Sequence, residues 1–326
     1  MKSLHISRRT LCALVALAFA ASAAPVYATA PMMQRQAPGF YRMMLGNDEI
    51  IALSDGTFDL PTDKLLVAPD PKRMATLLAR AHDGTAVETT VNAFLVNTGS
   101  KLILIDTGSA ELLGPTLGKV LDNLRAAGYQ PEQVDEVLIT HLHVDHVGGL
   151  LNNGKPSFPN ATVRVSKAEA DYWLNPANKD KAPESVRSGF VGAAAALKPY
   201  IDAGRFKTFS GAAVLEPGIT AVASPGHTPG HVSYRVESQG KTMLFWGDLV
   251  HVADVQFAAP AITIAFDSDQ PAARSARTAA YADAARKGYW VAGAHLPFPG
   301  IGHVESTSGG NVWAPVAWSE NRAAGP

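Results

Sequence analysis

Segments with strand-like alternation and segments with helix-like spacing of apolar residues follow one another along almost the whole chain. Residues 41–60 predict two short strands with a turn near Gly46 and Asn47. Residues 93–108 (AFLVNTGSKLILIDTG) predict a hairpin that turns at Thr-Gly-Ser. The second strand of this hairpin is almost entirely apolar, which indicates a strand covered on both faces.

The clearest helix is predicted over residues 115–127. Its apolar residues from Leu117 to Leu124 fall at i, i+3, i+4 and i+7, and Gly128 supplies a stop. Further helices are predicted over residues 71–81, 167–174, 184–202 and 271–287.

Strand patterns continue through the second half of the chain. They cover residues 134–140, 161–166, 218–224 and 231–238, then 241–248 and, as the final strand, 289–295. Strands and helices interleave without a linker-like stretch. Residues 29–326 are therefore expected to form a single α/β domain of two packed sheets with outer helices.

The first 28 residues differ from the rest and predict an export signal. A basic start, MKSLHISRRT, precedes the apolar run LCALVALAFAASAA and then small residues. Cleavage is expected after Ala23 or Ala28, and Ser7 to Leu11 resembles a twin-arginine signal. The apolar run is shorter than an ordinary membrane span. The mature protein is therefore expected in the periplasm or outside the cell, free of the membrane, with an uncleaved anchor as the alternative.

The net charge and the cysteine content limit which partners and which metal ligands are expected. The 326 residues carry a formal charge of −1, and removal of Lys2, Arg8 and Arg9 with the signal makes it −4. No basic stripe is present in the sequence, so a nucleic-acid partner is not expected. The signal also contains Cys12, the only cysteine. Any metal in the mature protein must therefore be bound by nitrogen and oxygen.

The stretch THLHVDHVGG, residues 140–149, concentrates three of the 10 histidines with one aspartate. His141 and His143 are two residues apart where a strand ends, so both project to the same side if the extended geometry persists. Asp145 and His146 follow as the chain turns. Donors that point to different sides of one turn can serve two different ions.

More metal-ligating residue types follow apolar strands further along the chain. SPGHTPGH contains His227 and His231, LFWGD ends in Asp248, and VAGAH ends in His295. In α/β folds, site residues commonly lie where a buried strand ends. These residues therefore belong to the same candidate site as the histidine-rich turn.

Together these motifs resemble the metallo-β-lactamase superfamily. LIDTG at residues 104–108 is similar to an early motif of that superfamily, in which Asp106 would support the metal loops. ALSDGTFDLP, GHTPGH and FPGIGH also resemble the methyl parathion hydrolase branch, and the likeness runs from about Ala37 to His303. The resemblance implies a four-layer αβ/βα sandwich and a homodimer.

By this resemblance the protein binds two divalent metal ions. One would be bound by His141, His143 and His227, the other by Asp145, His146 and His295, with Asp248 bridging the pair. Zinc is expected because imidazole and carboxylate ligands suit it, although manganese, cobalt or iron can occupy such a site. The family does not use the second histidine of the P-G-H turn as a ligand, so His231 is expected to support the metal site. His303 is expected to be structural.

Two neighbouring cations would lower the pKa of a shared water toward neutrality and make a bridging hydroxide the nucleophile. The candidate catalytic residues are Asp248 and Asp145, the second as a proton acceptor. No G-x-S-x-G motif occurs and the mature chain has no cysteine, so a protein nucleophile is not expected. A structural metal site is the alternative, but structural zinc favours closed, cysteine-rich shells.

The resemblance points to small uncharged substrates, which are organophosphate triesters, lactones or aryl esters. Trp173 and Phe190 match aromatic residues that line the organophosphate hydrolase pocket, although core packing explains them equally well. Leu113, His251 and Ile264 depart from that pocket. His251 is expected to donate a hydrogen bond to a substrate carbonyl or leaving alkoxide, with a surface-loop imidazole as the alternative.

We therefore expect a lactonase or esterase in which phosphotriester hydrolysis is a weaker side activity. A dedicated organophosphate hydrolase is the second hypothesis, and a periplasmic metal-binding protein without turnover is the third. The missing cysteine ligand disfavours a β-lactamase. The lack of a basic cluster disfavours a glutathione thioesterase and a nuclease.

Overall fold

The computed structural model describes residues 30–110 and 112–323. Residues Pro38–Pro326 form one compact unit, and the residues before them form another. Of the earlier unit, residues 30–37 are described; they are exposed and contain no helix or strand. The predicted export signal lies outside the described residues. Among the residues that are described, no helix has both the length and the apolarity that crossing a bilayer requires.

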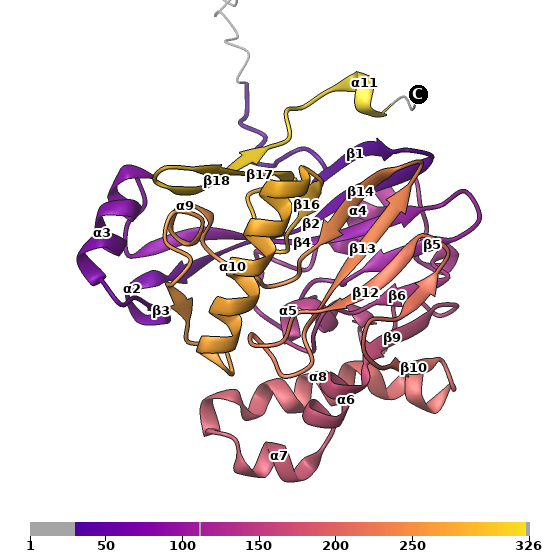
Figure 1. Ribbon diagram of the computed structural model, residues 1–326. Helices are drawn as coiled ribbons and strands as arrows, with labels where there is room; N and C mark the ends of the chain where they lie inside the picture. Colours follow the sequence, from indigo (N-terminus) through magenta and orange to yellow (C-terminus); the bar gives the residue numbers. More distant parts are fainter. Residues whose placement is uncertain (1–29, 111, 324–326) are drawn as a thin grey trace, which may run out of the picture. The chain divides into compact units, whose positions relative to one another are not determined.

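Two mixed β-sheets of seven strands each form the centre of the larger unit (Figure 1). The first has the order β1 (Phe40–Leu45), β2 (Asp48–Pro61), β4 (Ala86–Asn97), β5 (Leu102–Ile105), β6 (Glu136–Leu138), β9 (Thr162–Ser166) and β10 (Phe206–Phe209). The second has the order β11 (Val214–Glu216), β12 (Ile219–Ala223), β13 (Val232–Ser238), β14 (Lys241–Phe245), β16 (Trp290–Ala292), β17 (Ile301–Thr307) and β18 (Gly310–Pro315). The predicted α/β fold of two packed sheets is confirmed.

Strand alternation sends one set of side chains between the sheets and the other set outward. In β2, Ile50 and Ala52 belong to the core between the sheets, whereas Ile51 and Leu53 face the outer helices. The predicted strand with two covered faces is β5, in which Leu104 packs outward and its two neighbours pack inward.

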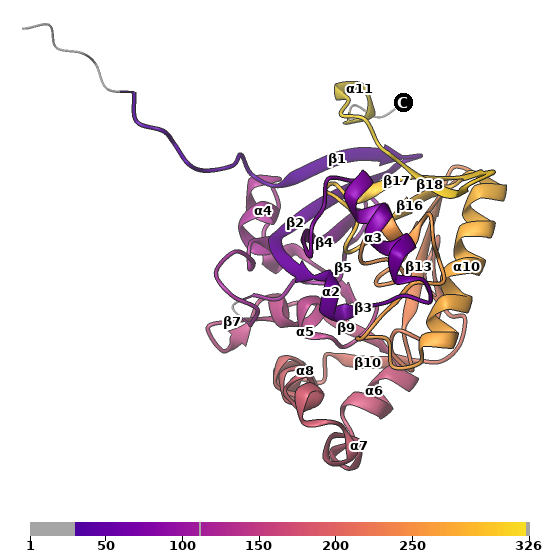
Figure 2. The same cartoon turned by 90° about the vertical axis from the view of Figure 1, so that its left-hand side faces the viewer.

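Helices cover the outer face of each sheet. The first sheet packs against α4 (Val120–Ala126), α6 (Lys167–Trp173) and α8 (Glu184–Asp202), and the second packs against α10 (Gln270–Lys287) (Figures 1 and 2). The four layers are therefore helices, sheet, sheet and helices, as the resemblance implied.

The other helical segments are α2 (Thr62–Leu65), α3 (Pro71–Arg80), η1 (Pro131–Gln133), α5 (Val144–Val147), η2 (Gly148–Leu150), α7 (Pro176–Lys181), α9 (Ala253–Gln256) and α11 (Glu320–Ala323). Two short strand pairs complete the elements: β3 (Leu66–Val67) with β15 (Thr263–Ile264), and β7 (Leu151–Asn152) with β8 (Lys155–Pro156).

Three expectations about the elements were wrong. The helix expected over residues 115–127 begins only at Val120, because Gly118 has a left-handed φ of +84° that no helix tolerates. The first hairpin contains one long strand, β2, which has a bulge between Ser54 and Gly56. The strand near residues 289–295 is not the last, since β17 and β18 follow it in the second sheet.

Candidate metal centre

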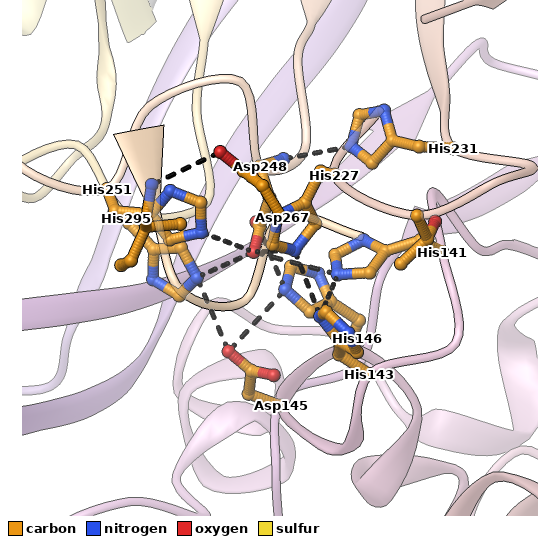
Figure 3. Close-up of polar contacts among 12 residues, drawn as sticks. His141, His143, Asp145, His146, His227, His231, Asp248, His251, Asp267 and His295 are labelled. Atoms are coloured by element: carbon orange, nitrogen blue, oxygen red, sulfur yellow. Dashed lines mark hydrogen bonds and ion pairs between the residues drawn. The ribbon is translucent and has the colours of Figure 1, made fainter. Parts of the chain in front are cut away.

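Loops that follow strands of both sheets deliver the candidate metal ligands to one place (Figure 3). The histidine-rich turn follows β6 in the first sheet, and His227 follows β12 in the second. Asp248 and His295 follow β14 and β16, which are parallel neighbours. Parallel strands present their carboxyl ends at the same edge, so these side chains converge.

One group of donor atoms consists of three histidines and Asp248. The Nδ1 atom of His143 lies 3.0 Å from Nε2 of His141 and 2.9 Å from Nε2 of His227. That His227 nitrogen is 3.2 Å from Oδ2 of Asp248. The donor atoms of the group all lie within 4.8 Å of one another.

A second group shares Asp248 with the first. Oδ1 of Asp248 is 3.1 Å from Nε2 of His146, and its Oδ2 is 3.2 Å from Nε2 of His295. Oδ2 of Asp145 is 3.3 Å from the same His295 nitrogen. The seven predicted ligands therefore come together as two groups of four that have one carboxylate in common.

Three of the five histidines have their outer ring nitrogen engaged in a hydrogen bond, so only the inner nitrogen remains to bind a metal. Nδ1 of His146 donates to Asp106 at 2.9 Å, and Nδ1 of His227 donates to Asp267 at 2.8 Å. Nδ1 of His295 donates to the Thr90 carbonyl oxygen at 2.8 Å. A neutral imidazole with one protonated nitrogen is a metal ligand through the other.

Unpartnered atoms at the centre also fit bound cations. Nε2 of His146 and Oδ1 of Asp248 are buried and lie 3.1 Å apart, yet neither forms a hydrogen bond of acceptable geometry among the described residues. Buried polar atoms are rarely left in this state. Five imidazoles and two carboxylates without sulfur suit two divalent ions of the zinc, manganese, cobalt or iron type.

Asp106 supports the turn without belonging to either donor group. It accepts hydrogen bonds from the backbone nitrogen and the hydroxyl of Thr140, each at 2.8 Å, as well as from His146. Its φ of +58° is left-handed, which is unusual for a residue with a side chain. The strained backbone is held by this set of hydrogen bonds.

Glu169 is a supporting residue that the sequence did not reveal. Its buried carboxylate accepts from the backbone nitrogens of Leu142 at 2.9 Å and Gly230 at 2.8 Å, and from the Thr228 hydroxyl at 2.8 Å. It thus joins the loop of His141 and His143 to the loop of His227. In the sequence, Ser166 followed by Glu169 indicates only a helix start.

The glycine pair after the histidine-rich turn is needed for close packing. A Cβ atom at Gly149 would lie 1.9 Å from the Thr107 carbonyl oxygen, and one at Gly148 would lie 2.3 Å from the Ser109 carbonyl oxygen. Gly149 also donates a backbone hydrogen bond to Gly108 at 2.9 Å. The turn therefore sits directly against the loop after β5.

His231 contacts the backbone of Asp248 rather than a donor group. Its Nε2 accepts from the Asp248 backbone nitrogen at 3.0 Å, and its Nδ1 lies 2.9 Å from the Ser224 hydroxyl. Both ring nitrogens are therefore engaged, which matches the supporting role that the resemblance gave it. His303 bonds to the Tyr289 carbonyl oxygen and packs on Trp290, away from the donor groups.

The proposed pocket residues divide into different environments. The Trp173 ring packs edge-on against the His143 ring, with 5.2 Å between ring centroids, and the Phe190 ring packs against that of Trp173 at 4.4 Å between centroids. Trp173 and Phe190 both belong to the outer core of the first sheet. Leu113 is 44% exposed. Ile264 is fully buried in a separate apolar cluster, so its side chain offers no exposed surface to a substrate.

His251 lies at the centre and is only 4% exposed, so the surface-loop alternative is wrong. Its Nε2 is 3.2 Å from Oδ2 of Asp248, and its ring stacks on the His295 ring with 5.2 Å between ring centroids. Two aromatic residues that the sequence did not single out lie nearby. Phe266 is 6.5 Å from His251, and Phe58 is 6.3 Å from His295, between ring centroids.

The charges of the metal-free centre are set by burial and by the carboxylates. Burial and then the positive charge of His227 lower the pKa of both His143 and His231 to about 3. Burial also opposes protonation of His227, but hydrogen bonds to Asp248 and Asp267 raise its pKa to about 9.

The stability of the metal-free protein is predicted to be highest near pH 6.5. Histidines with depressed pKa values, such as His143 and His231, bind protons in the unfolded chain first, so stability falls below that pH. His227 and His295 have pKa values raised to about 9 and about 10, so their contribution is lost as pH rises from 6.5 through those values. Thermal unfolding of chelated protein between pH 5 and 10 measures this, and a Tm that is constant from pH 7 to 10 would contradict it.

Known families and curated proteins match the part of the chain that contains this centre. Residues 86–295 match the profile of a family described as "Metallo-beta-lactamase superfamily". "Probable metallo-hydrolase Rv2300c" of Mycobacterium tuberculosis is 25% identical over 216 residues, which is 58% of this chain and 67% of that protein. "N-acyl homoserine lactonase AttM" of Agrobacterium fabrum is 30% identical over 158 residues, which is 45% of this chain and 54% of that protein. The matched segments thus leave a third or more of each relative uncovered.

Solved structures match over a larger share of the chain. "Hydrolase AbOPH in beta lactamase superfamily" is 40% identical with a TM-score of 0.83, and the match covers 88% of this chain and 100% of that one. "AidC, a Dizinc Quorum-Quenching Lactonase" is 27% identical with a TM-score of 0.79, covering 86% and 99%. An N-acyl homoserine lactone hydrolase with bound product is 20% identical with a TM-score of 0.57 and supports the fold alone.

Proposed function

This chain belongs to the metallo-beta-lactamase superfamily, and we propose that it is a two-metal hydrolase that cleaves lactones and aryl esters, with a weaker activity on phosphotriesters. The observation that carries the proposal is the Asp248 carboxylate, which belongs to both groups of donors: its Oδ2 lies 3.2 Å from Nε2 of His227 in one group and 3.2 Å from Nε2 of His295 in the other. A carboxylate shared by two donor groups would hold two divalent cations close together. A structural metal site has no need of this arrangement.

The residues proposed to hold the cations are those of the two donor groups. They are His141, His143 and His227 for one ion, Asp145, His146 and His295 for the other, and Asp248 for both. Two divalent cations bound there would polarise the substrate carbonyl or phosphoryl oxygen and lower the pKa of water toward neutrality. Zinc is the proposed metal, in keeping with AidC, which is described as a dizinc lactonase.

The protein's own residues hold the metal-binding histidines in place and accept a proton during the reaction. Asp106, Asp267 and the Thr90 carbonyl hold three of the imidazoles in one orientation, so little reorganisation accompanies the reaction. The Asp145 side chain is 15% exposed, against 2% for Asp248. Asp145 is thus the carboxylate that incoming water can reach, and we assign it the proton released from that water.

The preference for lactones and esters rests on the environment of the metal centre. His251 introduces a polar ring beside Asp248, and Leu113 replaces an aromatic residue of the organophosphate hydrolase pocket. Both changes make the site less suited to a flat nitrophenyl leaving group. The names of AttM and AidC as lactonases support the same preference.

Substrate ranking tests this assignment. Purified zinc-loaded protein is predicted to hydrolyse N-hexanoyl-homoserine lactone with a kcat/KM at least about 10-fold above that for paraoxon, a difference of about 1.4 kcal/mol. His251→Leu should move the ratio toward paraoxon by about 3- to 10-fold, the range of one hydrogen bond. His303→Leu makes the same change away from the centre and should leave the ratio unaltered. A clear preference of the wild type for paraoxon would overturn the ranking.

Two other functions are separated by the same assays. A dedicated organophosphate hydrolase would show the paraoxon preference. A periplasmic metal-binding protein would bind and exchange zinc but turn over none of the lactones, esters or phosphotriesters.

Export and dimerisation remain proposals for the mature protein. Export predicts a mature N-terminus after Ala23 or Ala28, which N-terminal sequencing of protein from the producing cell reads directly. A homodimer predicts twice the monomer mass in sedimentation.

A further inference from the structure

A buried arginine on the outer helix of the second sheet lies behind the metal centre. Arg277 belongs to α10 and is completely buried, whereas Arg274, one turn earlier, is exposed. Arginine is almost never fully buried unless its charge is paired, because removing an ion from water is costly. The position of Arg277 therefore depends on the partners that its guanidinium finds inside the protein.

Three backbone carbonyls accept hydrogen bonds from this guanidinium. Nε of Arg277 donates to the Leu249 carbonyl oxygen at 2.6 Å, and Leu249 directly follows the shared ligand Asp248. Nη1 donates to the carbonyl oxygens of Pro260 at 3.1 Å and Ile262 at 2.9 Å. The arginine thereby ties the segment after β14 to the segment that leads into β15.

The same guanidinium also faces the carboxylate that orients His227. Nη2 of Arg277 lies 3.7 Å from Oδ2 of Asp267, and Oδ1 of Asp267 accepts from Nδ1 of His227 at 2.8 Å (Figure 3). The side chains of Arg277 and Asp267 are 1% and 0% exposed. Arg277 is therefore connected to one metal ligand through Asp267, and to Asp248 through the backbone.

Gln256 extends this buried network along the loop after Asp248. Its side-chain nitrogen donates at 3.0 Å to the Ile262 carbonyl oxygen, which also accepts from Arg277. Its side-chain oxygen accepts from the backbone nitrogens of His251 at 2.7 Å and Val252 at 3.1 Å. Buried networks of this kind rigidify the segments that they join.

We propose that Arg277 is a positioning residue of the metal centre, which fixes the cation at the group of three histidines. It acts through Asp267 on His227 and through the backbone of Leu249 on Asp248. The inference rests on the proposed function, since it requires cations at the two donor groups. It adds a residue of the outer helix to the support of the centre.

The other cation should depend less on Arg277. Its histidines are oriented by different partners, because His146 donates to Asp106 and His295 donates to the Thr90 carbonyl oxygen. Only the shared carboxylate of Asp248 links this second group to the arginine. Loss of Arg277 should therefore weaken one bound metal ion more than the other.

Zinc titration of Arg277→Met tests this asymmetry. Methionine is unbranched and apolar, so it occupies the buried site but donates no hydrogen bond. In competition with a chromophoric chelator, one of the two zinc ions should bind about 10- to 100-fold more weakly than in the wild type, the usual cost of losing support for a metal ligand. The affinity for the other should change much less. Arg274→Met makes the same substitution on the exposed side of α10 and should leave both affinities unaltered.

Further measurements separate positioning from a general loss of stability. The visible absorption spectrum of the cobalt-loaded protein reports ligand geometry and should change in Arg277→Met but not in Arg274→Met. The kcat for N-hexanoyl-homoserine lactone should fall about 10- to 100-fold with little change in KM. The effects of Arg277→Met and Asp267→Asn on zinc affinity should be less than additive, because both act on His227.

Arg277→Lys provides a milder variant. It keeps a positive charge beside Asp267 but loses the fork of donors that reaches the carbonyls. The same zinc ion should therefore bind more weakly than in the wild type and more tightly than in Arg277→Met.

The outcomes separate this inference from the proposed function. Wild-type zinc affinities and an unchanged cobalt spectrum in folded Arg277→Met overturn the inference alone, and the same result in Arg277→Lys does so if the methionine variant does not fold. Wild-type protein that binds two zinc ions without hydrolysing any lactone or ester overturns the proposed function, while the variant affinities still decide the role of Arg277. Wild-type protein that binds no zinc overturns both.

Discussion

Asp248→Ala is expected to lower kcat/KM for the preferred lactone by about 1,000-fold or more, which corresponds to about 4 kcal/mol. The reason is that Asp248 belongs to both donor groups, so its loss removes one ligand from each cation at the same time. Bound zinc should fall from two equivalents to about one or fewer. Steady-state kinetics and elemental analysis of the same preparation measure both effects.

The Asp248 prediction has a matched control and a clear contrary result. Asp180→Ala removes a carboxylate that is 74% exposed on α7 and should leave activity and zinc content unchanged. His231 contacts the backbone nitrogen of Asp248 and not its side chain, so the local loop keeps this hydrogen bond in Asp248→Ala. Circular dichroism should therefore show a folded variant. Full turnover by folded Asp248→Ala would refute a shared-carboxylate mechanism.

Metal depletion is expected to have an effect of similar size. Dialysis against a chelator should lower kcat/KM by about 100-fold or more, because we expect no protein side chain to replace activated water as the nucleophile. Zinc at two equivalents should restore the rate. Reloading should also raise the free energy of unfolding, by about 2.7 kcal/mol for one site at a hundredfold excess over Kd.

The metal used for reloading provides the control for depletion. Magnesium should restore little activity, since it prefers oxygen ligands and five of the seven donors are imidazoles. Cobalt or manganese should restore activity to different degrees. Active protein that contains less than one equivalent of any transition metal would contradict the assignment of a two-metal centre.

The regular elements were predictable where local pattern and packing agree. The helix α10 was expected within one residue, with Gly288 in the left-handed conformation at its end. The turn between β4 and β5 was also expected, although β4 begins at Ala86, before the expected hairpin. The strand β18 was missed because it is an edge strand and only partly buried, so its alternation is weak. The late start of α4 was missed because apolar spacing does not report a left-handed glycine.

The candidate site was predictable only in its local part. The spacing of His141, His143, Asp145 and His146 is a property of one short turn, so it can be recognised without a fold. Asp267 was not singled out, although it orients His227 from 40 positions away. The sequence marked Ile264 as a pocket residue, but the structure buries it completely.

The sequence by itself determined the two-sheet α/β class, the residue types that can hold metal and the absence of sulfur among them. The resemblance already implied that Asp248 is common to two groups, whereas only the tertiary structure decided that Glu169 joins two ligand loops and that His251 is buried beside Asp248. The physical reason is the distance along the chain over which each kind of interaction acts. Periodicity and turn chemistry act over a few residues and leave a pattern in the chain, whereas hydrogen bonds between loops depend on how the two sheets bring distant strand ends together.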